Sequence, residues 1–158
     1  MKNLDGMRLW HREMIPYLPA QQLLGQWREL CCIGTHLATE HTPNHILVNP
    51  ILDYPPEHFE AFCNLVIKEM AKRKFNIQDT VLHKLQDDVR AWRLYLDQDL
   101  PFDYVDRDWS IDIGKPIYFD WHNQRYLRQC YYNLEEKYDR GGIPEKEWMV
   151  LFANFGGV

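Results

Sequence analysis

The sequence predicts a single all-α domain, and three observations favour this fold class. Apolar residues recur at spacings of three, four and seven in several separate stretches, the period of helices with one buried face. Signals for β-strands are weak, and no stretch is repeated elsewhere in the chain. The 158 residues are enough for one domain with a core of its own. We therefore expect one compact domain over residues 1–158, with about four helices joined by long loops.

Two helices are predicted in the N-terminal half. The first is expected to begin near Pro19, since proline suits the first turn of a helix, and its buried stripe would be Leu23, Trp27, Leu30 and Leu37. Residues 42–54 contain two prolines and are predicted to form a loop. A second helix is expected from about Pro56 to Lys74, with a buried stripe of Phe59, Phe62, Val66 and Met70.

Two more helices are predicted after residue 78. Asp79 and Thr80 can cap a third helix that reaches about Leu96. Residues 97–119 hold two prolines, one glycine and six aspartates, and a long irregular loop is expected there. Asp120 is expected to cap a last long helix. This helix is expected to end at the two glycines within residues 140–142. The aromatic residues that follow have two interpretations, packing onto the core or stacking on an unpaired base: Trp148, Phe152 and Phe155.

Composition and charge limit the compartment and the partners. No apolar stretch approaches the roughly 18 residues of a membrane span, and the start lacks the layout of a signal peptide, so a cytoplasmic protein without membrane association is expected. No C-x-x-C pair occurs among the four cysteines, and reduced thiols are predicted. Residues 79–120 carry five basic and ten acidic side chains, which accounts for the whole net charge of −5. The rest of the chain is neutral and can present a basic face.

The residues alone offer few signs of chemistry. Phosphate-binding, nucleophile-elbow and zinc-protease motifs are absent. His36, His41 and His45 span a helix end and a proline turn, so ordinary histidines are favoured over a metal site, and we expect no metal or cofactor. Arg28-Glu29 falls close to the apolar stripe of the first helix. A carboxylate there is costly unless paired, so Glu29 is either a salt-bridge partner at a solvated edge or a functional residue.

Four segments of the chain resemble, in order, segments of one known protein family. They are "YLPAQQLLGQWRELCCI", "TPNHILVNPILDY", "EMAKRKFNIQDT" and "NLEEKYD". They resemble, respectively, the first helix, the Pro-x-x-Ile-Leu loop, the end of the next helix and part of the last helix of the pyrimidine-dimer DNA glycosylase/AP lyase family, the phage endonuclease V type. The resemblance covers residues 7–80 and, more loosely, 117–150, whereas residues 81–116 have no clear counterpart.

The resemblance implies an activity and a catalytic site. In the family, a free α-amine at the mature N-terminus attacks C1′ of a damaged nucleotide and forms a Schiff base, while a glutamate in the first helix assists proton transfer. By position, Glu29 matches that glutamate and Met7 matches the first residue of the family. Residues 1–6 are then an N-terminal extension, and Arg8 stands where the family has its nucleophilic threonine. We expect Glu29 to lie next to residues 7–9.

The resemblance also implies DNA as the partner. Arg28 matches a phosphate-binding arginine, Gln22 stands where the family has a histidine, and Arg12 is a further expected DNA contact. The leading hypothesis is a monomeric DNA repair enzyme acting on damaged or modified double-stranded DNA. One alternative is a non-catalytic relative that binds nucleic acid, or a protein partner through the acidic residues 79–120. Another is a different hydrolytic activity on a nucleotide-like substrate, with Glu29 as the acid or base.

Overall fold

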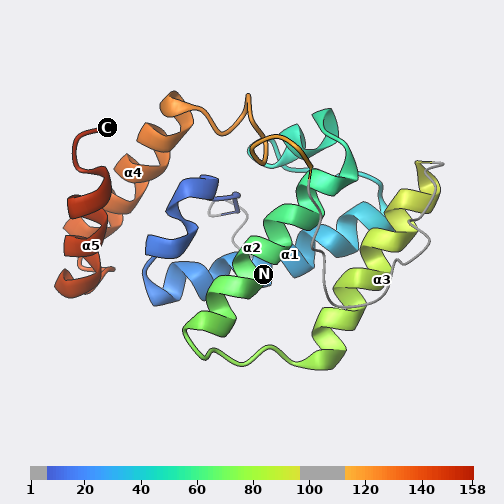
Figure 1. The fold of residues 1–158 in the computed structure, drawn as a ribbon, viewed down its shortest axis with the longest axis horizontal. Helices are drawn as coiled ribbons and strands as arrows, with labels where there is room; N and C mark the ends of the chain where they lie inside the picture. Colours follow the sequence, from blue (N-terminus) through green and yellow to red (C-terminus); the bar gives the residue numbers. More distant parts are fainter. Residues whose placement is uncertain (1–6, 97–112) are drawn as a thin grey trace.

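The computed structural model describes residues 7–96 and 113–158, and within these ranges the chain is helical and has no strand. The N-terminal extension over residues 1–6 and most of the predicted loop over 97–119 lie outside the described residues. The predicted all-α fold class is confirmed. In chain order the elements are the 3-10 helix η2 (Arg12–Tyr17), α1 (Ala20–Thr39), the 3-10 helix η3 (Asn49–Asp53), α2 (Pro56–Lys72), α3 (Asp79–Tyr95), α4 (Gln124–Asp139) and α5 (Glu145–Phe155) (Figure 1).

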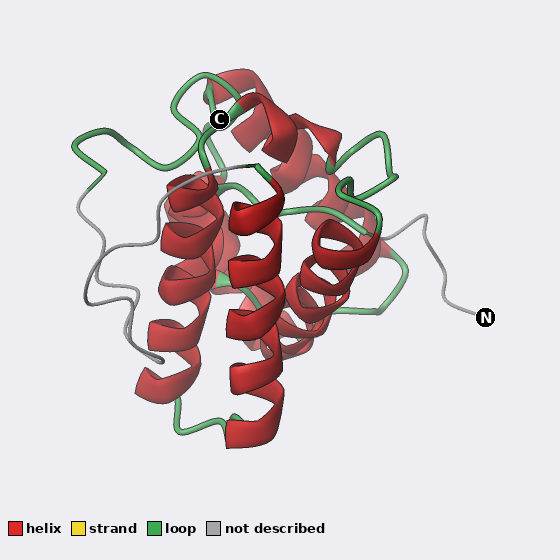
Figure 2. Ribbon diagram, turned by 90° about the vertical axis from the view of Figure 1, so that its right-hand side faces the viewer, coloured by secondary structure: helices red, strands yellow, loops and turns green. Residues whose placement is uncertain are grey.

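The helices pack as one group of three and one pair. Helix α1 packs most extensively on α3 and also contacts α2, and α4 pairs with α5 at the left of Figure 1. Figure 2 shows the helices seen from the side, with loops gathered at their ends. Apolar side chains from every element join one core. No helix in the described part of the chain is long and apolar enough to cross a membrane.

Two predictions near the C-terminus need correction. Helix α4 is capped by Asn123, whose side chain accepts a hydrogen bond from the Tyr126 N–H, and not by Asp120. The estimate of about four helices is too low, because residues 145–155 form the additional helix α5. Trp148 and Phe155 are buried against the core as one interpretation expected, but Phe152 is 54% exposed. Three exposed apolar residues, Met149, Val150 and Phe152, hide the apolar period of this short helix in the sequence.

Helices α1 and α3 approach closely at Gly34, and this contact predicts a stability difference between two glycines. A Cβ atom at Gly34 would lie 2.6 Å from Leu85 Cδ1, whereas one at Gly25 in the same helix meets only Arg28 Nη2, at 3.9 Å. We expect Gly34→Ala to lower the free energy of unfolding by about 1–3 kcal/mol through overpacking. Gly25→Ala should raise it by about 0.5–1 kcal/mol, because alanine favours the helix. Urea denaturation measures both, and equal effects at the two glycines would contradict this close approach.

Candidate active site

The first described residues lie against α1 and are held there by a buried amide. Gln26 is fully buried, and its side chain binds the N-terminal segment at two points. The backbone N–H of Trp10 donates to Gln26 Oε1 at 2.7 Å, and Gln26 Nε2 donates to the carbonyl oxygen of Arg8 at 2.9 Å. These two bonds fix the path of residues 8–10 across the helix.

The segment is anchored a second time by α4 and the turn before it. The Tyr126 hydroxyl donates to the carbonyl oxygen of Leu9. Arg12 N–H donates to His122 Nδ1 at 2.9 Å. Burial, together with the charges of His11 and Arg12, lowers the pKa of His122 to about 2, so this ring is neutral and accepts the bond. Hydrogen bonds from α1 on one side, and from α4 and the turn before it on the other, therefore position the residues that precede η2.

Glu29 lies next to this segment, as the sequence predicted. The Arg8 N–H donates to Glu29 Oε2 at 3.4 Å. Burial raises the pKa of Glu29 to about 7, against the hydrogen bond from Arg8 and the positive charges of Arg8, Arg28 and Lys137, which lower it. A carboxyl group with a pKa near 7 can both give and take a proton at neutral pH, which is the property of a general acid or base.

Glu29 lines two cavities. The larger, of about 430 Å³, is lined also by Met7 and Arg28. The smaller, of about 220 Å³, is lined also by Arg8 and Gln22. The carboxyl group is therefore accessible from two sides, and each cavity has an arginine in its wall.

The structure brings together five of the six predicted site residues. Around Glu29 lie Met7, Arg8, Gln22 and Arg28, as the linings of the two cavities show. The Oε1 atom of Gln22 is buried and has no hydrogen-bond partner among residues 7–96 and 113–158. Their roles in catalysis and in DNA binding stay predictions.

Arg12 lies outside the set of residues at Glu29. Its Nη1 donates to the carbonyl oxygens of Ile117 at 3.1 Å and of His122 at 2.8 Å. The guanidinium thus holds η2 to the segment before α4.

Three residues that complete the site were not singled out from the sequence. Gln26 could have been found as a polar residue beside the apolar stripe of α1, where an amide must have partners. Lys137 lines the smaller cavity, and it occurs within "NLEEKYD", a segment already matched to the family. Tyr126 gave no signal, since its role depends on a contact with Leu9, 117 positions away.

Two of the three histidines that were considered for a metal site, His36 at the end of α1 and His41 just after it, contact other groups. His41 stacks on Tyr95 with ring centroids 3.4 Å apart, and His36 Nδ1 lies 3.3 Å from the carbonyl oxygen of Pro43. Within the described ranges, no group of three His, Cys, Asp or Glu side chains is placed to hold a metal ion.

Comparison with known proteins identifies the family that the N-terminal half resembles. Residues 7–82 match the family model described as pyrimidine dimer DNA glycosylase. The match begins at Met7 and includes Gln26, Arg28 and Glu29, and it ends within the first turn of α3. No curated protein and no solved structure matches the chain. The resemblance seen in the sequence is therefore confirmed over these residues.

Proposed function

We propose that the protein acts on damaged double-stranded DNA as a pyrimidine dimer glycosylase with an abasic-site lyase step. The glycosylase activity is the one that gives the matching family its name. The observation that carries the proposal is the position of the Arg8 backbone nitrogen, 3.4 Å from Glu29 Oε2. An amine near this point would lie beside a carboxyl group whose pKa is raised to about 7, and this pairing supports Schiff-base chemistry.

The proposed nucleophile is the α-amine of Met7, in a chain that starts at this residue. Met7 lines the same cavity as Glu29. An α-amine has a pKa of about 7.7–8.0, so part of it is uncharged at neutral pH, whereas a lysine amine at about 10.4 is almost fully charged. Arg8, the next residue, supplies the N–H that holds Glu29 in place.

The reaction proposed for these two groups has four steps. The lone pair of the amine forms a bond to C1′, the bond between C1′ and the base breaks, and the base takes a proton from Glu29. The sugar ring opens, its oxygen takes a proton from the amine, and an iminium remains at C1′. The Glu29 carboxylate removes a proton from C2′, the C3′–O bond breaks, and the 3′ phosphate departs. Water then hydrolyses the iminium and restores the amine.

Cationic side chains around Glu29 are the proposed phosphate contacts. Arg28 is exposed at the mouth of the larger cavity, and Lys137 lines the smaller one. Gln22 lines the smaller cavity, and its buried, unpaired Oε1 would have to turn toward that cavity to accept a hydrogen bond from the nucleotide. Arg12 would have to exchange its bonds to two backbone carbonyls before it could reach DNA. The salt dependence of DNA binding grows with the number of phosphates that the protein neutralises, so binding through so few cations should weaken only moderately with added salt.

Covalent trapping tests the proposal. Chains that begin at Met1 and at Met7 are incubated with duplex DNA containing an abasic site or a pyrimidine dimer, in the presence of borohydride. We expect the Met7 chain to form a reduced adduct, which peptide mapping places on the Met7 amine. Acetylation of that amine should abolish the adduct. Lys137→Gln removes a proposed phosphate contact and should weaken DNA binding, but at saturating DNA it should still form the adduct.

Two outcomes would contradict this mechanism. If neither chain gives an adduct or strand cleavage, the lyase proposal is wrong, and salt-dependent DNA binding without an adduct would favour the non-catalytic relative. An adduct that maps to Lys137, which lines the smaller cavity together with Glu29, would reject Met7 as the nucleophile.

A further inference from the structure

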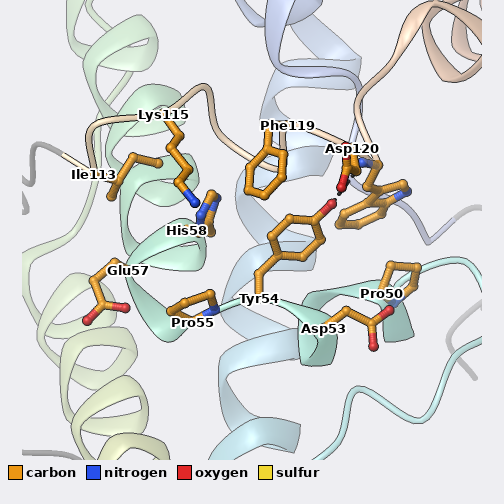
Figure 3. Close-up of a pocket in the computed structure, with 11 residues that line it drawn as sticks. Pro50, Asp53, Tyr54, Pro55, Glu57, His58, Ile113, Lys115, Phe119 and Asp120 are labelled. Atoms are coloured by element: carbon orange, nitrogen blue, oxygen red, sulfur yellow. Dashed lines mark hydrogen bonds between the residues drawn. The ribbon is translucent and has the colours of Figure 1, made fainter.

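A larger cavity, of about 680 Å³, lies between η3, the start of α2 and residues 113–121 (Figure 3). None of its lining residues lines either cavity at Glu29. Its volume is within the range of small-molecule sites, about 300–1,000 Å³. It is therefore a second, separate candidate site.

The walls of this cavity are aromatic. The rings of Tyr54 and Phe119 meet edge to face, with centroids 5.5 Å apart, and the rings of Tyr54 and His58 are 5.0 Å apart. Figure 3 shows these three rings around one space. The backbone N–H of Trp121 donates a hydrogen bond to the Tyr54 hydroxyl at 2.8 Å and fixes the Tyr54 ring. Preformed aromatic walls favour a planar ligand, which can stack on them.

His58 offers one hydrogen-bond donor to such a ligand. The side chain is only 5% exposed, and its Nδ1 accepts a hydrogen bond from Tyr118 N–H at 2.9 Å. Burial lowers the pKa of His58, and the nearby Lys115 lowers it further against the charge of Glu57. The ring is therefore neutral at pH 7 and carries its proton on Nε2. This Nε2 has no hydrogen-bond partner in the described part of the chain, and His58 lines the cavity.

The charged residues that line the cavity disfavour the binding of a ligand with several negative charges. Glu57, which lines the cavity, is paired with Arg93 at 3.2 Å, and this leaves the carboxylates of Asp53 and Asp120 against one lining cation, Lys115. Lys115 Nζ already lies over the Phe119 ring, 4.9 Å from its centroid. Excess negative charge would repel a DNA strand or a nucleoside triphosphate. Carboxylates do accept hydrogen bonds from the amino groups of bases.

We propose that this cavity binds a free nucleoside whose base carries both a ring acceptor and an exocyclic amino group. Because the rings of Tyr54 and Phe119 are nearly perpendicular, the base stacks on one of them and meets the other at its edge. A ring nitrogen accepts the proton of His58 Nε2, and the amino group donates to a carboxylate of the lining.

Titration calorimetry with three matched ligands tests the choice of ligand. Adenosine should bind, and purine riboside, which lacks only the amino group, should bind about fivefold to tenfold more weakly through the loss of one hydrogen bond. Adenosine triphosphate should bind at least about tenfold more weakly than adenosine because of its charge. The proposal is overturned if adenosine does not bind, or if the triphosphate binds as tightly as adenosine.

A pair of phenylalanine variants locates the binding site. Phe119→Ala removes a cavity wall and should lower the affinity for adenosine about tenfold or more. Phe152→Ala, a change on α5 away from the cavity, should leave it unchanged. Phe119 and Phe152 are 37% and 54% exposed, so both variants should fold. Equal binding by the two variants would place adenosine elsewhere, and displacement of adenosine by a single-stranded oligonucleotide would reject a free nucleoside as the ligand.

Discussion

Glu29→Gln is expected to slow strand cleavage at an abasic site by about 100-fold to 10,000-fold, the usual contribution of a general acid or base. Glutamine has nearly the same shape and can still accept the hydrogen bond from Arg8 N–H, but it cannot give or take a proton. Affinity for abasic-site DNA should change little. Single-turnover cleavage and a binding titration on the same variant separate these two effects.

Glu29→Gln should also stabilise the fold, but only at pH values above the ordinary pKa of a glutamate. The folded protein has a Glu29 pKa of about 7, against the ordinary glutamate value of 4.5. Between these pH values the folded state keeps a proton that the unfolded chain has lost, so stability falls as the pH rises from 4.5 to 7 and then stays constant. The neutral glutamine avoids this loss.

Because Glu29 is partly exposed, we expect Glu29→Gln to gain about 2 kcal/mol at pH 8 and nothing at pH 4. Urea denaturation at the two pH values measures the difference. Glu136→Gln, at an exposed position of α4, is the matched control and should change neither cleavage nor stability. A loss of stability at pH 8 for Glu29→Gln would contradict the raised pKa.

The helices were predictable from the sequence where local signals and buried stripes agreed. The start of α1 and both ends of α2 and α3 lie within about two residues of their predicted positions, because proline starts, basic ends and helical periods act over a few residues. The start of α4 was ambiguous, since Asp120 and Asn123 are both capable caps. Only the tertiary setting of residues 113–123 selects Asn123.

The two candidate sites differ in how far the sequence could reveal them. Glu29 and Arg28 lie one after the other on a helix, so their placement follows from the helix and from the family resemblance. The path of residues 7–11 depends on Tyr126 and His122, more than 100 positions away. The second cavity needs Tyr54 and Phe119, which no local pattern connects. Contacts of this kind depend on the completed fold.

Arg93→Met is expected to lower the free energy of unfolding by about 3–5 kcal/mol. This is the usual cost of removing one partner of a buried ion pair while the other charge stays buried. Arg93 of α3 is 2% exposed and Glu60 of α2 is fully buried. Arg93 Nε donates to Glu60 Oε1 at 3.0 Å, and Nη2 lies 3.2 Å from Glu57 Oε1. Without the guanidinium, the buried Glu60 carboxylate loses this ion pair with α3 and must take up a proton or draw in water.

A second substitution separates the charge from the packing. Replacing Glu60 by glutamine in the Arg93→Met background removes the buried charge, so we expect it to recover at least about half of the lost stability. The single variant should also be less unstable at pH 5 than at pH 8, since protonation neutralises Glu60. Arg140→Met is the control at an exposed ion pair. The Arg140 side chain, which pairs with Glu136, is 77% exposed, so its loss should lower the free energy of unfolding by no more than about 0.5 kcal/mol. If the double variant is as unstable as Arg93→Met, the lost packing of Arg93 and not the buried charge of Glu60 is the cause.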